Sequence, residues 1–280
     1  MRLDVGSRTD VGRVRENNED SYRVVVPLQV FIVSDGMGGE ANGEVASALA
    51  VETVADYCQA SLDNPQAPLA VETRSGLSAR TNRLASALNL ANRRIYESAL
   101  QHPEQRGMGA TIVAAWAEGS LLSIAHVGDS RIYLLRGGEL QQLTADHSLV
   151  AEQVRSGLIS KQQAEVSELQ NVLTRALGPH AEVLIDAAEH PLQPGDAIVL
   201  CTDGLTRMIS DEELASVVAT HPAPQDAADR LVELANENGG TDNITVIVVR
   251  IAPEPDGLID KLKRWTGTGE KKPDHADDTE

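Results

Sequence analysis

The chain is poor in aromatic residues and in positive charge, and each shortage narrows the class of protein. Aromatic residues make up 2% of the 280 residues, so a core must be built mainly from Leu, Val, Ile and Ala. Lys and Arg number 24 against 42 Asp and Glu, which gives a net charge of −18. Nucleic acids and anionic membranes attract basic surfaces, so we expect neither as the main partner.

Long apolar runs and cysteine motifs are missing as well. No run approaches the roughly 20 apolar residues of a membrane-spanning helix, so we expect no membrane insertion. The first ten residues, MRLDVGSRTD, lack the apolar stretch of a secretory signal. Cys58 and Cys201 show no CxxC spacing, which favours reduced, buried thiols over a disulfide or a zinc site. We therefore predict a soluble, cytoplasmic protein.

Four apolar runs carry an aspartate at one end. The runs VFIVSDG, LLSIAHVGD and AIVLCTDG end at Asp35, Asp129 and Asp203, whereas TDNITVIVV begins with Asp242. The runs are short and rich in branched residues, which indicates buried strands, with the first ending at Ser34. If these strands are antiparallel, three run toward one rim and the fourth leaves it. The four carboxylates would then gather at that rim.

This group of carboxylates is typical of a site for a hard divalent cation. NNEDSY adds Glu19 and Asp20, and no histidine or cysteine accompanies the set at ligand spacing. Oxygen donors suit Mg²⁺ or Mn²⁺ and disfavour zinc or copper. Two such ions can activate a shared water for hydrolysis of a phosphate ester. Each Asp-Gly alone would be an ordinary turn signal, and only the repetition favours a site.

An arginine near the start of the chain offers a phosphate ligand. Arg15 lies five residues before Asp20, and its guanidinium could hold two phosphate oxygens. It could equally form a salt bridge to the carboxylates themselves. Arg13 would share the same face of an extended segment, so the pattern alone does not separate the two arginines.

The remaining pattern groups strands with helices without a repeating βαβ unit, which predicts an α+β fold of antiparallel sheets with helices packed outside. Residues 146–180 are polar and helix-prone, and we interpret them as a partly helical flap near the carboxylate rim. Residues 253–280 are charged and contain Gly and Pro, which predicts a mobile tail. The other expected elements are a strand at 3–12, a hairpin at 21–33, helices at 40–62, 73–101, 210–221 and 223–238, and strands in between.

Eight motifs in order resemble a known family. RVRENNEDSY, SDGMGGEANGEVAS, MGATIVAA, HVGDSRIYLLRGGEL, LTADHS, NVLTRALG, PGDAIVLCTDGL and GGTDNITVIVV are similar to those of the bacterial metal-dependent protein serine/threonine phosphatases, the protein phosphatase 2C-like (PPM) family. The resemblance covers about residues 5–250. It implies a four-layer αββα sandwich formed by one catalytic domain, residues 1–252, followed by the tail. It also implies hydrolysis of phosphoserine and phosphothreonine in proteins, in opposition to a bacterial Ser/Thr kinase, and we expect a monomer.

The same resemblance implies roles for individual residues. Asp35 would bridge two Mn²⁺ or Mg²⁺ ions, with the Gly36 carbonyl on one of them. Asp203 and Asp242 would bind the other ion, while Glu19 and Asp20 would act mostly through water. Asp129 resembles the ligand of a third, weaker ion, which Asp203 would share. Arg15 resembles the arginine that holds substrate phosphate, which selects it over Arg13.

One position departs from the eukaryotic pattern of this family. A histidine proposed as general acid follows Asp-Gly there, whereas this chain has Met37, and a thioether cannot donate a proton. His126 and His147 are candidates for the missing acid by their nearness in sequence, although the DHS context of His147 favours a structural role, and a metal-bound water could serve instead. Two other functions compete with the phosphatase: a non-catalytic phosphoprotein-binding module on the same fold, and another two-metal hydrolase such as a nuclease. The complete set of aspartates disfavours the first, and the charge of −18 disfavours the second.

Overall fold

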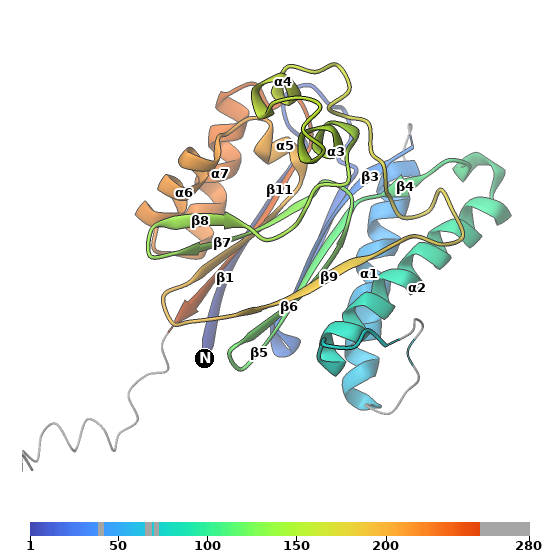
Figure 1. Cartoon of the computed structure of the whole chain (residues 1–280), viewed down its shortest axis with the longest axis horizontal. Helices are drawn as coiled ribbons and strands as arrows, with labels where there is room; N and C mark the ends of the chain where they lie inside the picture. Colours follow the sequence, from blue (N-terminus) through green and yellow to red (C-terminus); the bar gives the residue numbers. More distant parts are fainter. Residues whose placement is uncertain (39–41, 65–68, 70–72, 253–280) are drawn as a thin grey trace, which may run out of the picture.

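The computed structural model describes residues 1–38, 42–64, 69 and 73–252 and shows two central sheets with helices on both outer sides (Figure 1). The tail predicted for residues 253–280 lies outside the described residues. All strand pairs named in the sheets are antiparallel. The predicted α+β, four-layer αββα sandwich is therefore confirmed.

The two sheets contain strands from distant parts of the chain. In the first sheet the order is β1 (Arg2–Asp10), β11 (Ile244–Ala252), β10 (Ala197–Cys201), β7 (Arg131–Arg136) and β8 (Glu139–Gln142). In the second sheet the order is β2 (Asp20–Val25), β3 (Val30–Met37), β5 (Ile112–Glu118), β6 (Leu121–Val127) and β9 (Asp186–Pro191), with β4 (Gly109–Ala110) paired to β3. The first and last strands of the described chain pair with each other, so the two ends close one sheet.

Each sheet carries a helical layer on its outer face. Helices α1 (Asn42–Asp63) and α2 (Ala79–Gln101) cover the second sheet, while α6 (Asp211–Thr220) and α7 (Pro224–Glu237) cover the first (Figure 1). The predicted capping box at Ser210 is present and starts α6. Helix α2 begins later than the expected residue 73, because Ser78 caps its N-terminus by accepting from the Thr81 amide. The remaining helices are α3 (Leu149–Arg155), α4 (Lys161–Glu165) and α5 (Asp203–Thr206), with short 3-10 turns at Val26–Leu28 and Pro103–Gln105.

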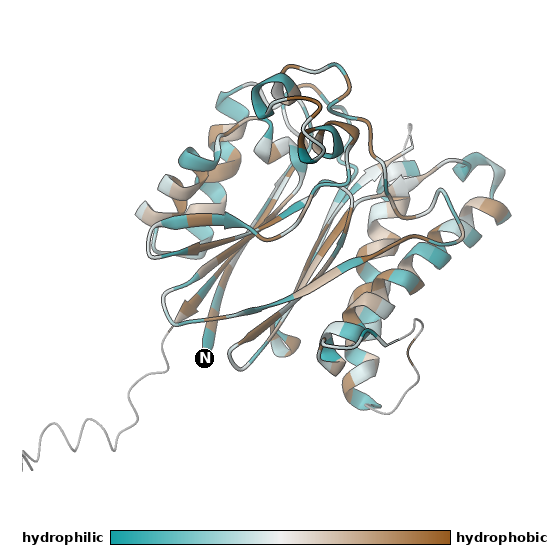
Figure 2. Ribbon diagram, in the orientation of Figure 1, coloured by the Kyte–Doolittle hydropathy of each residue, from teal (hydrophilic) through white to brown (hydrophobic). Residues whose placement is uncertain are grey.

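Three apolar layers explain why the strands appear as continuous apolar runs. In β3, Val30 and Ile32 pack toward α1 and α2, whereas Phe31 and Val33 pack into the core between the sheets. Side chains alternate along a strand, so a strand buried on both faces needs no polar positions. Figure 2 shows the same pattern as hydrophobic strands with hydrophilic patches on the outer helices. Cys58 and Cys201 are buried and free, as the sequence predicts.

The flap and the strand ends lie at one end of the sandwich. The segment at 146–180 contains α3 and α4, which cover that end in Figure 1. Strands β3, β6 and β10 finish there, and β11 begins there. None of the described helices combines the length and the apolar character that a bilayer crossing demands.

Candidate metal centre

The hairpin of β2 and β3 places two carboxylates side by side. Asp20 and Asp35 are direct partners in the antiparallel register, so their side chains project on the same face. Strand β3 continues to Met37 because β4 pairs with its last two residues. The expectation that the strand ends at Ser34 is therefore wrong, and Asp35 is held within the ladder.

Glycine at the next position lets other backbone segments approach the hairpin. The Gly36 amide donates to the Glu19 carbonyl at 3.1 Å. A Cβ at Gly36 would lie 2.0 Å from the Gly43 carbonyl oxygen at the start of α1. Only glycine fits between these groups.

The other carboxylates come from the first sheet and from the turn after β6. Asp129 lies in the turn between β6 and β7, Asp203 is the first residue of α5 after β10, and Asp242 precedes β11. A Cβ at Gly204 would lie 2.0 Å from the Asn243 carbonyl oxygen, so glycine allows the start of α5 to approach β11 closely. The four aspartates lie at one rim, as the sequence analysis expects, and the structure adds that the strands which carry them come from both sheets.

These residues line one cleft of about 450 Å³. All the predicted site residues line it except Asp20, which is buried and pairs with the cleft residue Asp35 in the β2–β3 register. Asn171 and Leu173, both from the flap, also line the cleft, so the flap borders the site. The lining residues are Arg15, Glu16, Asn17, Glu19, Asp35, Gly36, Met37, Gly38, Thr111, Asp129, Asn171, Leu173, Asp203, Arg207, Asp242 and Asn243.

Two polar residues that the sequence analysis did not single out join the parts of the site. Thr202 donates through Oγ1 to Asp20 Oδ2 at 2.9 Å and accepts from the Thr245 amide at 3.0 Å, which links the two sheets. The Asn243 side chain accepts from the Glu19 amide at 2.8 Å and donates to the carbonyl oxygens of Val11 and Asn17, each at 2.9 Å. Asn243 thus fixes the loop between β1 and β2, residues 11–19, against the start of β11.

The crowding of carboxylates changes their proton affinity. Burial, together with the nearby charges of Asp203 and Asp242, raises the pKa of Asp20 to about 7, although hydrogen bonds from Thr245 and Thr202 act to lower it. Burial and the charge of Asp203 raise the pKa of Asp129 to about 7. Burial, with Asp203 and Asp20 nearby, raises the pKa of Asp35 well above its usual range. Such carboxylates need a cation or protons to coexist.

The donor set fits a pair of hard divalent cations. The cleft lining provides carboxylate, carbonyl and amide oxygens, and it contains neither histidine nor cysteine among the described residues. Oδ1 of Asp20 and Oδ1 of Asp203 are buried without a hydrogen-bond partner. A buried carboxylate oxygen without a partner is costly, and a bound cation would satisfy it.

Arg15 lies at the edge of this cleft, and both alternatives considered for it have support in the structure. Its Nη2 donates to Asp242 Oδ2 at 2.9 Å, which is the salt bridge to a carboxylate. Its side chain remains 53% exposed and faces the cleft, where a phosphate could reach the same guanidinium. Arg13 is exposed and does not line the cleft.

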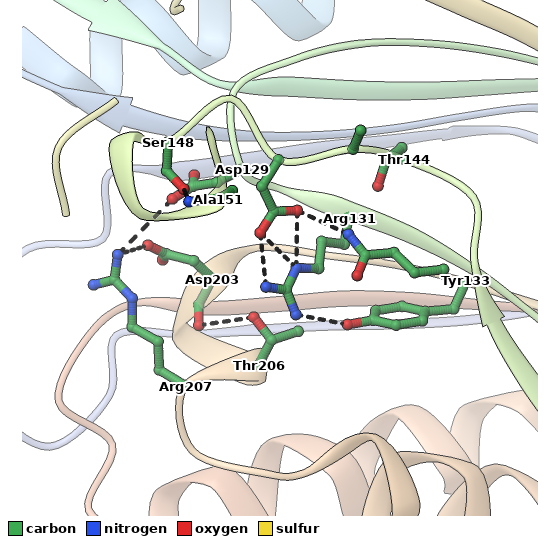
Figure 3. Close-up of polar contacts among 12 residues, drawn as sticks. Asp129, Arg131, Tyr133, Thr144, Ser148, Ala151, Asp203, Thr206 and Arg207 are labelled. Carbon is green, nitrogen blue, oxygen red and sulfur yellow. Dashed lines mark hydrogen bonds and ion pairs between the residues drawn. The ribbon is translucent and has the colours of Figure 1, made fainter. Parts of the chain in front are cut away.

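A second arginine, Arg207, enters the carboxylate group and was missed from the sequence. It forms an ion pair with Asp203, four residues earlier, at the end of α5 (Figure 3). Its nitrogens also lie 4.0 Å from Asp129 Oδ2 and 3.9 Å from Asp242 Oδ2. The Asp-to-Arg spacing of four residues was the one local signal for this pair.

The two candidate general acids lie elsewhere, so that expectation is wrong. His126 and His147 stack on each other with ring centroids 4.8 Å apart, and neither lines the cleft. His147 accepts from the Gly128 amide at 3.1 Å and contacts Asp186 Oδ2 at 3.2 Å. Burial, His126 and Arg175 lower the pKa of His147 to about 4, so the ring is neutral at neutral pH and is not the protonated imidazolium that a general acid needs.

Comparison with known proteins gives consistent results. A family model described as protein phosphatase 2C matches residues 12–242. The chain is 39% identical over 247 residues to the serine/threonine phosphatase stp of Listeria monocytogenes, covering 86% of this chain and 93% of that protein.

Two solved structures resemble the fold closely. The crystal structure of the Mycobacterium tuberculosis serine/threonine phosphatase PstP/Ppp matches with a TM-score of 0.79 at 35% identity, covering 90% of this chain and 99% of the other. The catalytic domain of PstP in complex with two manganese ions matches with a TM-score of 0.77 at 35% identity and the same coverage.

Proposed function

Because this chain belongs to the protein phosphatase 2C family and is a metal-dependent protein serine/threonine phosphatase, we propose that its carboxylate rim is the catalytic metal centre. Asp35, the Gly36 carbonyl, Asp203 and Asp242 would hold two Mn²⁺ or Mg²⁺ ions, with Asp35 as a ligand shared by both. Glu19 and Asp20 would act mostly through water. The observation that carries this proposal is the convergence of carboxylates from both sheets in a cleft of oxygen donors.

The residues around the carboxylates have separate roles in hydrolysis: one binds the phosphate, and others hold the metal ligands in place. When bound, the two ions supply an activated water as nucleophile and offset the negative charge of the phosphate. Arg15 holds phosphate oxygens with its exposed guanidinium and orients the ester. Thr202 fixes Asp20, and Asn243 fixes the loop that carries Arg15 and Glu19. Asp20 and Glu19 are therefore held in place by neighbouring side chains before any ion binds.

The leaving group receives its proton from water. Met37 lines the cleft where a general acid could stand, and its thioether has no proton to give. His126 and His147 are buried and belong to a separate cluster with the partly exposed Asp186. The cleft opens to solvent, so water can reach the departing serine or threonine oxygen.

The substrates follow from this chemistry. The enzyme acts on phosphorylated proteins in the cytoplasm and reverses the work of a bacterial Ser/Thr kinase, as a monomer. Its acidic character favours substrates with basic residues near the phosphate. The non-catalytic binding module is disfavoured, because every carboxylate that the chemistry needs is present at the rim.

Turnover of a phosphothreonine peptide in Mn²⁺, compared with a phosphodiester oligonucleotide, tests this proposal. The account predicts phosphate release from the peptide and no cleavage of the oligonucleotide. Tight peptide binding without turnover would establish the binding module instead. Cleavage of the oligonucleotide in preference to the peptide would favour the nuclease.

A further inference from the structure

The carboxylates of Asp129 and Asp203 already have a cation of the protein's own between them. The Arg207 guanidinium forms an ion pair with Asp203 and lies 4.0 Å from Asp129 Oδ2 (Figure 3). Asp242 Oδ2 lies 3.9 Å away on another side. Among the described residues, these are the carboxylates within 4.0 Å of its nitrogens.

Arg207 differs in this respect from the other arginine nearby. Arg131 is also close to the rim, but its guanidinium donates to both Asp146 oxygens, at 2.7–3.1 Å, and to the Tyr133 hydroxyl at 2.9 Å. Arg131 is therefore committed to groups outside the metal centre. The ion pairs of Arg207, by contrast, are all made with expected metal ligands.

The short helix α5 dictates this placement. Asp203 is its first residue, and Arg207 follows directly after its last. The Arg207 amide donates to the Asp203 carbonyl at 2.9 Å, which closes one helical turn. Residues four apart on a helix face the same side, so the guanidinium folds back over the carboxylate that begins the turn.

The geometry points to Arg207 as a built-in counter-ion that takes the place of a third metal ion between Asp129 and Asp203. This inference rests on the proposed two-metal centre. A guanidinium stays charged at every physiological pH, so it offsets carboxylate charge without a bound ion. It offers donors and no acceptor, so it cannot coordinate a metal. A divalent ion at this place would have to break the pair with Asp203 and displace the arginine.

Two consequences follow for the wild-type enzyme. It should bind two Mn²⁺ ions and no third one that depends on Asp129. Replacing the arginine should open the third position, because no cation of the protein then lies between Asp129 and Asp203. Asp129 is thus the partner of a side chain in this protein rather than the ligand of an ion.

Counting bound Mn²⁺ tests this inference without measuring activity. Metal-stripped protein is titrated with Mn²⁺, and free ion is followed by electron paramagnetic resonance. We expect two ions in wild type, three in Arg207→Ala, and two again in the Arg207→Ala, Asp129→Ala double variant. Arg207→Met keeps the apolar stem and serves if Arg207→Ala does not fold. Arg230→Ala is the matched control, since it removes the same charge from an exposed pair with Glu237 on α7.

The outcomes separate this inference from the proposed function. Three ions in wild type, with one lost in Asp129→Ala, would overturn the role of Arg207 and leave the two-metal centre intact. Two bound ions in both Arg207→Ala and Arg207→Met would also overturn it, because Arg207 would then not be what keeps a third ion out. Fewer than two ions in wild type would remove the proposed metal centre and this inference together.

Discussion

Replacing Arg15 by alanine tests whether the guanidinium that contacts Asp242 also holds the substrate. If it binds phosphate, Arg15→Ala should raise KM for a phosphothreonine peptide and weaken inhibition by free phosphate. Affinity for Mn²⁺ should stay the same or rise, because a positive charge leaves the neighbourhood of Asp242.

The structure sets the size of the effect. A hydrogen bond between charged groups contributes about 1.5–3 kcal/mol, and each 1.4 kcal/mol is a factor of about ten. The Arg15 side chain is 53% exposed and must share its charge between Asp242 and the phosphate. Both facts favour the lower end of this range of free energy, so we expect a KM increase of roughly tenfold. If the contact strengthens in the transition state, kcat falls as well.

Steady-state kinetics on one peptide, with Mn²⁺ binding measured on the same samples, decides the matter. Arg13→Ala is the matched control. It removes the same charge two residues away, from an exposed side chain that does not line the cleft. Equal KM changes in the two variants, or a loss of Mn²⁺ affinity in Arg15→Ala, would show that Arg15 is only a structural partner of the carboxylates.

Three further predictions concern the centre, the buried histidines and the tail. Asp35→Asn or Asp203→Asn should lower kcat by several orders of magnitude while the circular dichroism spectrum is unchanged, because each removes a proposed metal ligand; near-normal turnover would make these carboxylates structural. The folded-state pKa of His147, about 4, lies below its ordinary 6.5, so its contribution to stability is present above pH 6.5 and is lost as pH falls toward 4. That loss amounts to roughly 3 kcal/mol, and urea unfolding of His147→Asn should show a flatter acid profile than wild type. Deleting residues 253–280 should leave the melting temperature and the turnover of p-nitrophenyl phosphate unchanged, and a large drop in either would show that the tail supports the catalytic domain.

The carboxylate positions could be predicted because local sequence encodes them. A short apolar run that ends in Asp-Gly marks a strand and its tip, and the sheet topology converts several such tips into one rim. Asp35 and Asp203 follow this rule, Asp129 ends its run after a glycine, and Asp242 precedes the run that becomes β11. The continuous apolar runs likewise predicted buried strands, and the layers on either side of β3 show that this strand is buried on both faces.

Long-range partners could not be predicted in the same way. Asn243 fixes a loop more than 220 residues earlier in the chain, and no local pattern announces that contact. The spacing of Asp203 and Arg207 is a local signal for one ion pair that the sequence analysis did not use. The pairing of β10 with β11 brings Asp242 to the same guanidinium, and the turn from β6 to β7 brings Asp129 there, which no local pattern announces. His126 was a candidate acid because it lies three residues before Asp129. Yet its ring stacks on His147, outside the cleft.

The most direct test of the two-metal centre follows turnover as Mn²⁺ is added stepwise to metal-stripped protein, with bound ion counted at each step. The account predicts no hydrolysis of a phosphothreonine peptide without metal, and activity that appears with the second bound ion and is abolished by EDTA. Full turnover in the metal-stripped protein, or activity restored by Zn²⁺ alone, would contradict it.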